Sequence, residues 1–566
     1  MENFNLTPRQ EVIKSILVDR FHIPTGSLNL AELQELSQDS KPEQIRAFAF
    51  DIVSQFGTEK HPVRMMSEVS KTVTEFAEII GIEIDEFPCN IGNVDLVKHP
   101  PPEVDFVTNP PSESEFADLP DLAVVFDTEA FEFLKIIRDT YFERWIEAYG
   151  SGYHDSGIFP ETAQALEIFM ERANLHLIRD EENIAFQSIK LSLGASEGLS
   201  IAFASVNKYF KDKTKSELSH TSDPSAVERL NARLSNKTIF IHPGPSFVAT
   251  DSEASSYGNI HTLQLEPPMF EITDEYIEYI KRLISNTNDN CLIIEDTPNP
   301  LGRRLTNAEW QRIDRLMDEF PELVCVLDHA YVGLAQNEDL SSMVAFRKKY
   351  VDRIISIGSI SKVGANPMER IGAVIYPTAN PQNPNALGNA VESYISVLHP
   401  TLSINMEAYI LAKLQIMLVG NNFYKRSLLL TFSKFKTGAK KLAHLRELLE
   451  PKDPSTKYIE EETSKLFRQR TQLLYNVLRE QESQLDSPLF ESIIEPQNTL
   501  YVFAKLPDGM SGLDLYLKTG IAAVPGECFG EAGKGWIRLS VGILSEDEIR
   551  KMGIVLSEAF NQTNEC

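Results

Sequence analysis

The feature that most constrains the fold is a series of short, almost wholly apolar runs separated by longer helical stretches. Five of these runs lie in the middle of the chain, at residues 237–242, 291–295, 323–327, 353–357 and 371–376. Continuous runs rich in aliphatic and β-branched residues are typical of strands buried on both faces, and the stretches between them supply the helical crossovers that parallel strands need. The sequence therefore predicts an α/β domain around a mainly parallel sheet.

The rest of the chain is organised around this domain. Helical spacing at 9–21, 41–56 and 69–80 predicts an N-terminal helical extension, which is acidic and ends in a proline-rich linker. Strand patterns at 499–504 and 536–540, and a helix from Glu546, predict a smaller α/β domain. We expect four segments: an extension with its linker, the first part of the small domain, the large domain, and the C-terminal helices with the rest of the small domain, at 1–115, 116–185, 186–395 and 396–566.

Composition narrows the classes of function. The 566 residues include 82 Asp and Glu against 54 Lys and Arg, a net charge of −28. Nucleic acids and anionic membranes bind to basic surfaces, so we expect neither as a partner. The sequence has no signal-peptide pattern and no apolar run long enough to span a bilayer. Its five cysteines are scattered without a C-x-x-C pair, which favours a cytoplasmic protein.

Polar side chains follow four of the five apolar runs. Ligands of an open parallel sheet bind beyond the carboxyl ends of its strands, so these side chains are candidate site residues. We expect seven of these side chains to converge at one edge of the sheet. They are the ring of Phe247, the amide of Asn299, the carboxylate of Asp328, the phenol of Tyr331, the hydroxyl of Ser359, the amine of Lys362 and the guanidinium of Arg370. The histidines are not spaced as metal ligands, so we expect no metal site.

Several motifs occur in an order that points to one family. They are Asn299-Pro300-x-Gly302, Asp328-x-x-Tyr331, Ser359-x-x-Lys362, Arg370-x-Gly372 and, near the C-terminus, Arg538. Together they resemble the fold-type I pyridoxal-phosphate (PLP) enzymes, specifically the class I/II aminotransferases, over roughly residues 116–560. The resemblance implies a large domain with a seven-stranded sheet, PLP as cofactor, and a homodimer with sites completed across the subunit interface.

The resemblance also implies catalytic roles. Lys362 would form the Schiff base with PLP and then, as a free amine, move the proton between the substrate Cα and the cofactor. Asp328 would hold the pyridine nitrogen protonated, which makes the ring an electron sink. Tyr331 and Asn299 would hydrogen-bond the ring oxygen O3′.

The cofactor phosphate would lie at the start of a helix. The resemblance assigns it the guanidinium of Arg370 and the hydroxyl of Ser359. The backbone N–H groups of Gly194, Ala195 and Ser196 would supply the remaining donors, because a helix N-terminus with small residues is a ready anion site.

The resemblance also implies which residues would contact the substrate and the cofactor ring. Arg538 would clamp the substrate α-carboxylate, with Asn299 beside it. Phe247 would stack on the cofactor ring. A tyrosine from the neighbouring subunit would reach the site, for which Tyr153 is the candidate and Tyr149 a rival.

Other readings of single residues stay open. Asp328 could cap a helix, Arg538 could form a salt bridge on an edge strand, and Phe247 could fill the core. The chain also departs from the family pattern, because Leu301 and Met368 stand where a threonine and a glycine are common, and the N-terminal extension lies outside the usual length.

The leading function is therefore a PLP-dependent aminotransferase that exchanges an amino group between an α-amino acid and a 2-oxo acid. The alternative is a PLP-dependent lyase, decarboxylase, replacement or cyclisation enzyme of specialised metabolism, because the same electron sink supports those reactions. A third class is a regulator whose N-terminal helices bind DNA. The extension argues against it, since residues 1–110 hold 18 acidic and 9 basic side chains.

Overall fold

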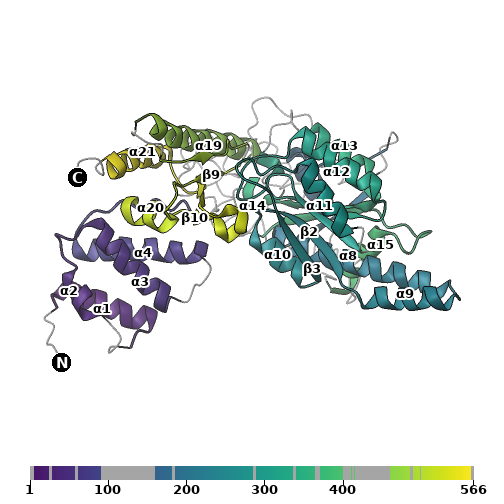
Figure 1. The fold of residues 1–566 in the computed structure, drawn as a ribbon, viewed down its shortest axis with the longest axis horizontal. Helices are drawn as coiled ribbons and strands as arrows, with labels where there is room; N and C mark the ends of the chain where they lie inside the picture. Colours follow the sequence, from purple (N-terminus) through teal and green to yellow (C-terminus); the bar gives the residue numbers. More distant parts are fainter. Residues whose placement is uncertain are drawn as a thin grey trace, which may run out of the picture.

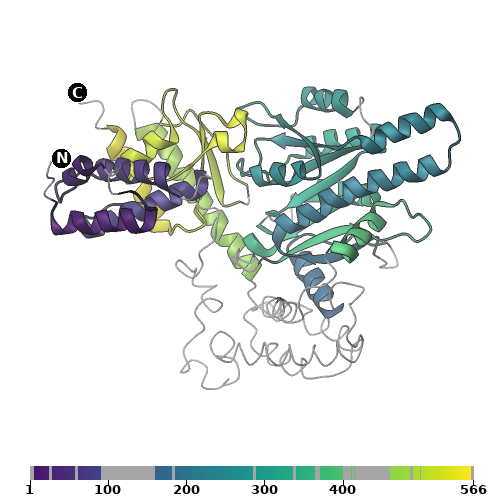
Figure 2. The same cartoon turned by 90° about the horizontal axis from the view of Figure 1, so that it is seen from below.

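In a computed structural model of the chain, an N-terminal helical bundle, a small α/β domain and a large α/β domain lie in a row (Figures 1 and 2). The structure describes residues 6–24, 29–57, 62–90, 160–180, 185–284, 289–334, 340–363, 370–398, 410, 414, 459–484, 489–497 and 499–561. No helix within these ranges is both long and apolar enough to cross a membrane.

The large domain is built on a seven-stranded sheet with the order β1-β7-β6-β5-β4-β2-β3. The strands β3, β2, β4, β5 and β6 pair in parallel, whereas β7 is antiparallel to both of its neighbours. Their bounds are Gln187–Ser192 (β1), Thr238–Gly244 (β2), Gly258–Gln264 (β3), Asn290–Glu295 (β4), Val324–His329 (β5), Ile354–Ser359 (β6) and Gly372–Pro377 (β7).

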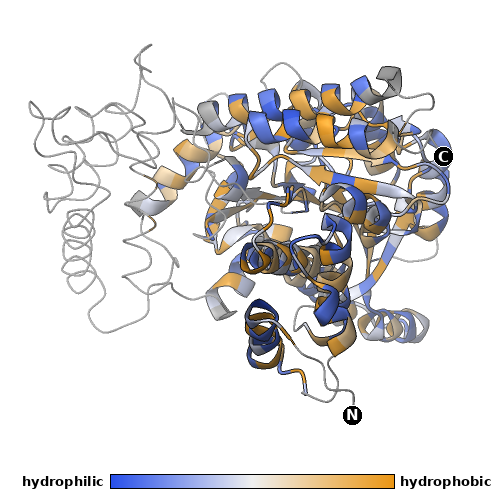
Figure 3. Ribbon diagram, turned by 90° about the vertical axis from the view of Figure 1, so that its left-hand side faces the viewer, coloured by the Kyte–Doolittle hydropathy of each residue, from blue (hydrophilic) through white to orange (hydrophobic). Residues whose placement is uncertain are grey.

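Helices cover both faces of this sheet, which is why β4, β6 and β7 are buried along their whole length. The apolar residues on one face pack against α8 (Gly194–Ser219), α10 (Val248–Ser255) and α15 (Leu387–Leu398). Those on the other face pack against α7 (Pro160–Arg172), α11 (Asp274–Ile284), α12 (Asn307–Glu319) and α13 (Ser341–Lys349). Helices drawn in Figure 3 carry both hydrophilic and hydrophobic residues along the ribbon, as is typical of helices that cover a sheet with one face.

Short elements complete the large domain. The helix α9 (Pro224–Ser235) follows α8 and has no buried residue. The short helix α14 (Ile360–Val363) comes directly after β6, and the 3₁₀ turns η2 (Val332–Leu334) and η4 (Val351–Arg353) follow β5 and precede β6. The helix α7 packs against the large sheet, since Met170 contacts the backbone of β6 at Gly358.

The small domain contains an antiparallel sheet with the order β10-β11-β9-β8. Its strands are Ser492–Ile493 (β8), Tyr501–Lys505 (β9), Val524–Pro525 (β10) and Trp536–Ser540 (β11), with the turns Gly526–Phe529 (η6) and Glu531–Gly533 (η7). Three helices accompany it: α19 (Ile459–Gln484), α20 (Gly512–Thr519) and α21 (Glu546–Asn561). Its apolar residues join those under the large sheet in one continuous core, so the two domains share an extensive apolar contact.

The N-terminal bundle comprises α1 (Pro8–Phe21), α2 (Leu30–Glu35), α3 (Pro42–Phe56) and α4 (Pro62–Ile80). Thr7 and Gln10 form a capping box at the start of α1, which satisfies backbone donors at this helix end. The bundle has its own apolar core, and Tyr516 and Ala522 of the small domain are part of it. The bundle is therefore docked on α20, as Figure 1 also shows.

A buried ion pair fixes this docking. Arg46 of α3 donates to the carboxylate of Glu86 at 2.7 Å, and both side chains are almost fully buried. Arg46 also donates to the carbonyls of Asp85 and Leu517, while the hydroxyl of Tyr516 donates to Glu86 at 2.9 Å. The pair thus joins the bundle, the chain that leaves it and the small domain.

Residues 85–90, here called the connecting arm, continue along the small-domain sheet. The N–H of Phe87 donates to the carbonyl of Gly520 and its carbonyl accepts from Ala522, both at 2.9 Å. The N–H of Ser540 donates to the carbonyl of Cys89 at 2.7 Å. These bonds carry the arm to the end of β11.

The sequence predictions of secondary structure agree with these elements where the pattern was strong. All five apolar runs are strands of the large sheet, and the predicted strands near residues 499–504 and 536–540 are β9 and β11. The α/β fold with a seven-stranded, mainly parallel sheet is confirmed. The sequence analysis did not identify β1, β3, β8 and β10. The strand β3 lies at the sheet edge and mixes polar with apolar residues, so it lacks the continuous apolar run.

We expect Arg46→Ala to lower the free energy of unfolding by about 3–5 kcal/mol, because it leaves the Glu86 carboxylate buried without its cation. The matched control is Arg20→Ala, which breaks surface ion pairs with Glu68 and Glu75 and should cost no more than about 1 kcal/mol. Urea unfolding followed by circular dichroism compares the two, and equal losses would contradict a special role for the buried pair.

Candidate active site

The carboxyl ends of the central strands bring the predicted residues to one edge of the large sheet. Glu295 at the end of β4 is the register partner of Asp328 in β5, and Asp328 is in turn paired with Ile357 of β6. Lys362 lies in α14, three residues after the end of β6. The edge that the sequence analysis selected therefore holds the carboxylate at the end of β5 and the amine just after the neighbouring strand β6.

The carboxyl group of Asp328 has a raised pKa. Its side chain is half-buried, and its Oδ1 accepts a hydrogen bond from the N–H of Ala330 at 3.0 Å. Burial, and next the negative charge of Glu295, raise the pKa of Asp328 to about 7. A cation placed against this carboxylate would relieve both effects.

His242, at the end of β2, is sandwiched between two carboxylates. Its Nδ1 lies 2.6 Å from Asp251 of α10, and its Nε2 lies 3.3 Å from Glu295. Burial alone would lower the pKa of His242, but hydrogen bonds to these two carboxylates raise it to about 9. His242 is therefore an imidazolium whose charge is shared between Asp251 and Glu295.

The start of α8 forms a cradle for an anion. The guanidinium of Arg370 lies directly over Gly194, so close that a Cβ on Gly194 would be 2.7 Å from its Nη2. The same nitrogen donates to the Ser196 hydroxyl at 3.4 Å. Gly194 also has a φ of +80°, a backbone conformation that residues with a side chain rarely adopt. Ser359 ends β6 and is the register partner of Gly372, two residues after Arg370. Its hydroxyl accepts a hydrogen bond from the N–H of Ser361.

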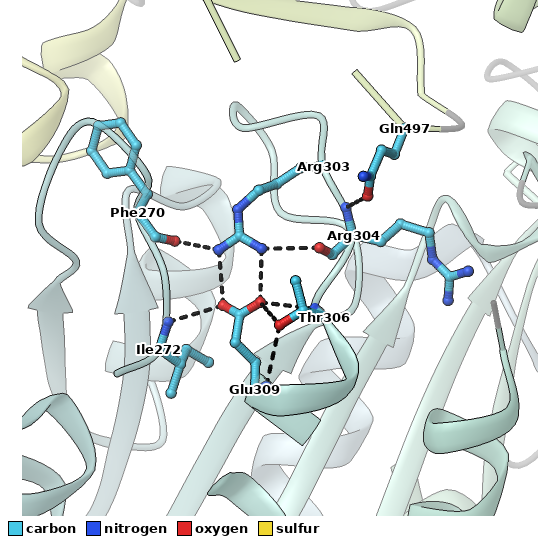
Figure 4. Close-up of polar contacts among 7 residues, drawn as sticks. All are labelled: Phe270, Ile272, Arg303, Arg304, Thr306, Glu309 and Gln497. Atoms are coloured by element: carbon cyan, nitrogen blue, oxygen red, sulfur yellow. Dashed lines mark hydrogen bonds and ion pairs between the residues drawn. The ribbon is translucent and has the colours of Figure 1, made fainter. Parts of the chain in front are cut away.

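The loop that carries Asn299 is held by hydrogen bonds to both the large and the small domain. Its far end contains Arg303, which forms two parallel hydrogen bonds with Glu309 at 2.8 and 2.9 Å, and Glu309 caps α12 through Thr306 (Figure 4). From the small domain, Gln497 accepts from the N–H of Arg304 and donates its own N–H to the carbonyl of Gly302. These contacts hold the loop in one conformation.

Asn299 itself lies between two charged groups. Its N–H donates to Glu295 at 3.0 Å, and its side-chain oxygen accepts from Nη1 of Arg538 at 3.0 Å. The amide thus connects the strand ends of the large domain with β11 of the small domain.

Arg538 is 3% exposed and is held from several sides. Its Nη2 donates to the carbonyl of Asn90, the last residue of the connecting arm, at 2.9 Å. Its guanidinium carbon lies 4.3 Å from the ring centroid of Tyr501 and 5.2 Å from that of Phe529. These bonds use only part of its five N–H donors, so it retains capacity for a carboxylate.

Two buried phenols, those of Tyr331 and Tyr501, belong to the same cluster. The hydroxyls of Tyr331 and Tyr501 are 3.0 Å apart. Burial would raise the pKa of Tyr501, but the positive charges of Lys362 and Arg538 bring it below its ordinary value. Lys362 and Arg538 therefore both act on the same buried phenol.

Phe247 and Tyr153 were also predicted at the site. Phe247 lies just before α10 and is 42% exposed, so it does not fill the core. Tyr153 and its rival Tyr149 lie outside the described residues.

The sequence analysis missed four residues of the site: Asn90, His242, Glu295 and Tyr501. A signal was present for Glu295, because a charged residue at the end of an apolar run lies at the strand end where ligands bind. Asn90 takes part through its backbone carbonyl, for which no residue type is diagnostic.

Comparisons with known proteins agree with this geometry. Residues 229–419 match the family described as aminotransferase class I and II. A probable aspartate aminotransferase of Methanocaldococcus jannaschii is 24% identical over 318 residues, which is 55% of this chain and 69% of the relative. The chain is thus similar to class I and II aminotransferases over the central part of its large domain.

Solved structures agree on the fold. An amino transferase from Eubacterium rectale has a TM-score of 0.53 at 18% identity and covers 91% of this chain and 99% of its own. An aminotransferase from Neisseria meningitidis has a TM-score of 0.51 at 16% identity and covers 84% and 93%. Class I/II aminotransferases of this fold are PLP-dependent, and the match over residues 229–419 supports the same activity for this chain.

The residues present fit that cofactor. A phosphate suits the cradle of Gly194, Ser196 and Arg370, because Gly194 and Ser196 lie in the first turn of α8 and the guanidinium of Arg370 lies against both. A protonated pyridine nitrogen suits Asp328, whose raised pKa marks a carboxylate that a cation would stabilise.

We expect the protein prepared without cofactor to lose stability as the pH rises. The pKa of Asp328 is raised to about 7 and that of His242 to about 9, and a group with a raised pKa stabilises the fold only while it is protonated. The contribution of Asp328 is present below pH ~4 and is lost towards pH ~7. That of His242 is lost between pH ~6.5 and ~9.

Thermal unfolding midpoints from pH 4.5 to 9 test this expectation. Relative to wild type, Asp328→Asn should become progressively more stable between about pH 4 and 7 and then stay level. The exposed Asp352→Asn is the control and should track the wild type at every pH. A constant difference for Asp328→Asn across this window would contradict the raised pKa.

Proposed function

We propose that this aminotransferase exchanges an amino group between an α-amino acid and a 2-oxo acid, with Lys362 as the residue that carries PLP. The observation that supports the proposal most is the placement of Tyr501, on which the charges of Lys362 and Arg538 both act. An amine for the cofactor and a guanidinium for a carboxylate are thus within electrostatic reach of one another.

Each group has a role that its surroundings support. PLP supplies an electron sink when a bond to the substrate Cα is broken. Asp328 would hold the pyridine nitrogen protonated, and Arg370 with Ser196, Ser359 and the N–H groups of Gly194 and Ala195 would hold the phosphate. Lys362 would remove the proton from Cα and return it to the cofactor carbon.

The substrate carboxylate would bind to Arg538. Its guanidinium is already oriented by Asn299 and Asn90, so little conformational freedom is lost when a ligand binds. The rings of Tyr501 and Phe529 exclude water around it, which strengthens the pairing with a carboxylate.

We also infer a homodimer, in which Tyr153 of a neighbouring subunit completes the site and Phe247 covers the cofactor ring. The family resemblance supports this assembly, and the exposed ring of Phe247 is consistent with a covered position in the loaded enzyme. The scattered cysteines support a cytoplasmic location.

A spectroscopic panel tests the reaction. The purified yellow protein is mixed with single amino acids, and we expect its visible band to bleach with at least one of them and to return when a 2-oxo acid is added. Release of ammonia or carbon dioxide without this reversal would support the lyase or decarboxylase alternative instead.

Lys362→Ala should abolish the visible band and the covalent adduct found by borohydride reduction and peptide mapping, because no other amine is expected to hold PLP. The exposed Lys237→Ala is the matched control and should retain both. An adduct at another lysine in the wild-type protein would overturn the assignment.

Arg538→Lys should raise the KM for the amino acid about 10- to 100-fold, because an ammonium cannot form the two parallel hydrogen bonds of a guanidinium. The affinity for PLP should change little. The surface variant Arg315→Lys, which alters only a pair with Asp274, provides the control. An unchanged KM would show that the carboxylate binds elsewhere.

A further inference from the structure

Tyr501 lies at the junction between the cofactor side and the substrate side of the site. It opens β9 of the small domain, and its side chain is 2% exposed. Its ring meets that of Tyr331 edge-on, with centroids 5.7 Å apart. No motif of the sequence analysis includes it.

The small-domain sheet dictates its contact with Arg538. Tyr501 pairs with Ser540 of β11, and Arg538 is two residues before Ser540. Residues two apart in a strand point to the same face, so Tyr501 and Arg538 are diagonal neighbours on that face. The guanidinium consequently lies over the ring, in the geometry of a cation–π contact.

The hydroxyl of Tyr501 has a role that follows from counting protons. The two phenols share one hydrogen bond of 3.0 Å, and each hydroxyl has a single proton to donate. If Tyr331 donates its proton to O3′ of PLP, then Tyr501 must be the donor in the bond between the phenols. A phenol that accepts a hydrogen bond becomes a stronger donor itself.

We propose that Tyr501 is a further positioning residue of this enzyme, with two separable functions: its ring orients Arg538 for the substrate carboxylate, and its hydroxyl donates to Tyr331 and thereby strengthens the bond from Tyr331 to O3′. The proposal rests on the proposed function, because it requires PLP to be linked to Lys362. It adds a residue that acts through its neighbours on both substrate and cofactor.

The hydroxyl function is tested without turnover, by titrating the visible absorbance of the holoenzyme with pH. A stronger hydrogen bond to O3′ stabilises its negative charge and lets the Lys362–PLP linkage lose its proton at lower pH. Tyr501→Phe should therefore move the absorbance midpoint upwards by about half a pH unit. Tyr331→Phe should move it further in the same direction.

The double variant decides whether Tyr501 acts through Tyr331. If it does, Tyr331→Phe with Tyr501→Phe should have the same midpoint as Tyr331→Phe alone, because the intermediate donor is already gone. Additive shifts, or an unmoved midpoint for Tyr501→Phe, would overturn this half of the inference. Loss of the visible band from the wild type would instead overturn the proposed function, and this inference with it.

The ring function is tested by comparing two replacements of Tyr501. Tyr501→Phe keeps the ring and should leave the KM for the amino acid within about twofold of wild type. Tyr501→Met fills a similar space without an electron-rich ring face and should raise the KM about 10-fold while kcat changes less. Thermal unfolding confirms that both variants fold. Equal KM values for the two would show that the ring does not position Arg538.

Discussion

The site depends on one costly arrangement, which is a carboxylate placed among other carboxylates at the end of a buried strand. Asp328 lies beside Glu295, and burial with that neighbouring charge raises its pKa to about 7. The protein does supply a cation nearby, but the imidazolium of His242 is bound between Asp251 and Glu295. A positive charge from the ring nitrogen of PLP would therefore complete the electrostatics of the strand ends, which explains why a chain can retain such an unfavourable cluster.

The N-terminal extension takes part in the architecture of the site. The ion pair between Arg46 and Glu86 docks the bundle on α20 and fixes the start of the connecting arm. The arm then lies along the small-domain sheet and ends with the carbonyl of Asn90 on Arg538. The bundle, the arm and the substrate arginine are thus joined by continuous contacts. The N-terminal extension, which lies outside the usual length of the family, is consequently connected to the place where substrates would bind.

What could be predicted from the sequence followed from local patterns. The strands β4 to β7 are continuous apolar runs because both of their faces are buried, and the rule that ligands bind at strand ends led to Asp328, Asn299 and Lys362. The edge strand β3 has no such run. Tyr501 and Asn90 could not be predicted in the same way, because their roles arise from sheet register and from a backbone carbonyl, and neither leaves a pattern of residue types.

The same contacts explain how two domains can form one site. The residues expected to hold the cofactor come from the large domain, whereas Arg538, expected to bind the substrate carboxylate, comes from the small domain, so a relative movement of the domains would move Arg538 away from Lys362. Two contacts resist such movement at the site itself: the amide of Asn299 holds Arg538, and the hydroxyl of Tyr331 meets that of Tyr501. Both contacts start from a residue expected to bind O3′ of PLP: one leads to Arg538, expected to bind the substrate carboxylate, and the other to Tyr501, which contacts Arg538. With PLP and substrate bound in this way, single hydrogen bonds would couple substrate binding to the electronic state of the cofactor, and substitutions of Asn299 or Tyr501 would alter both.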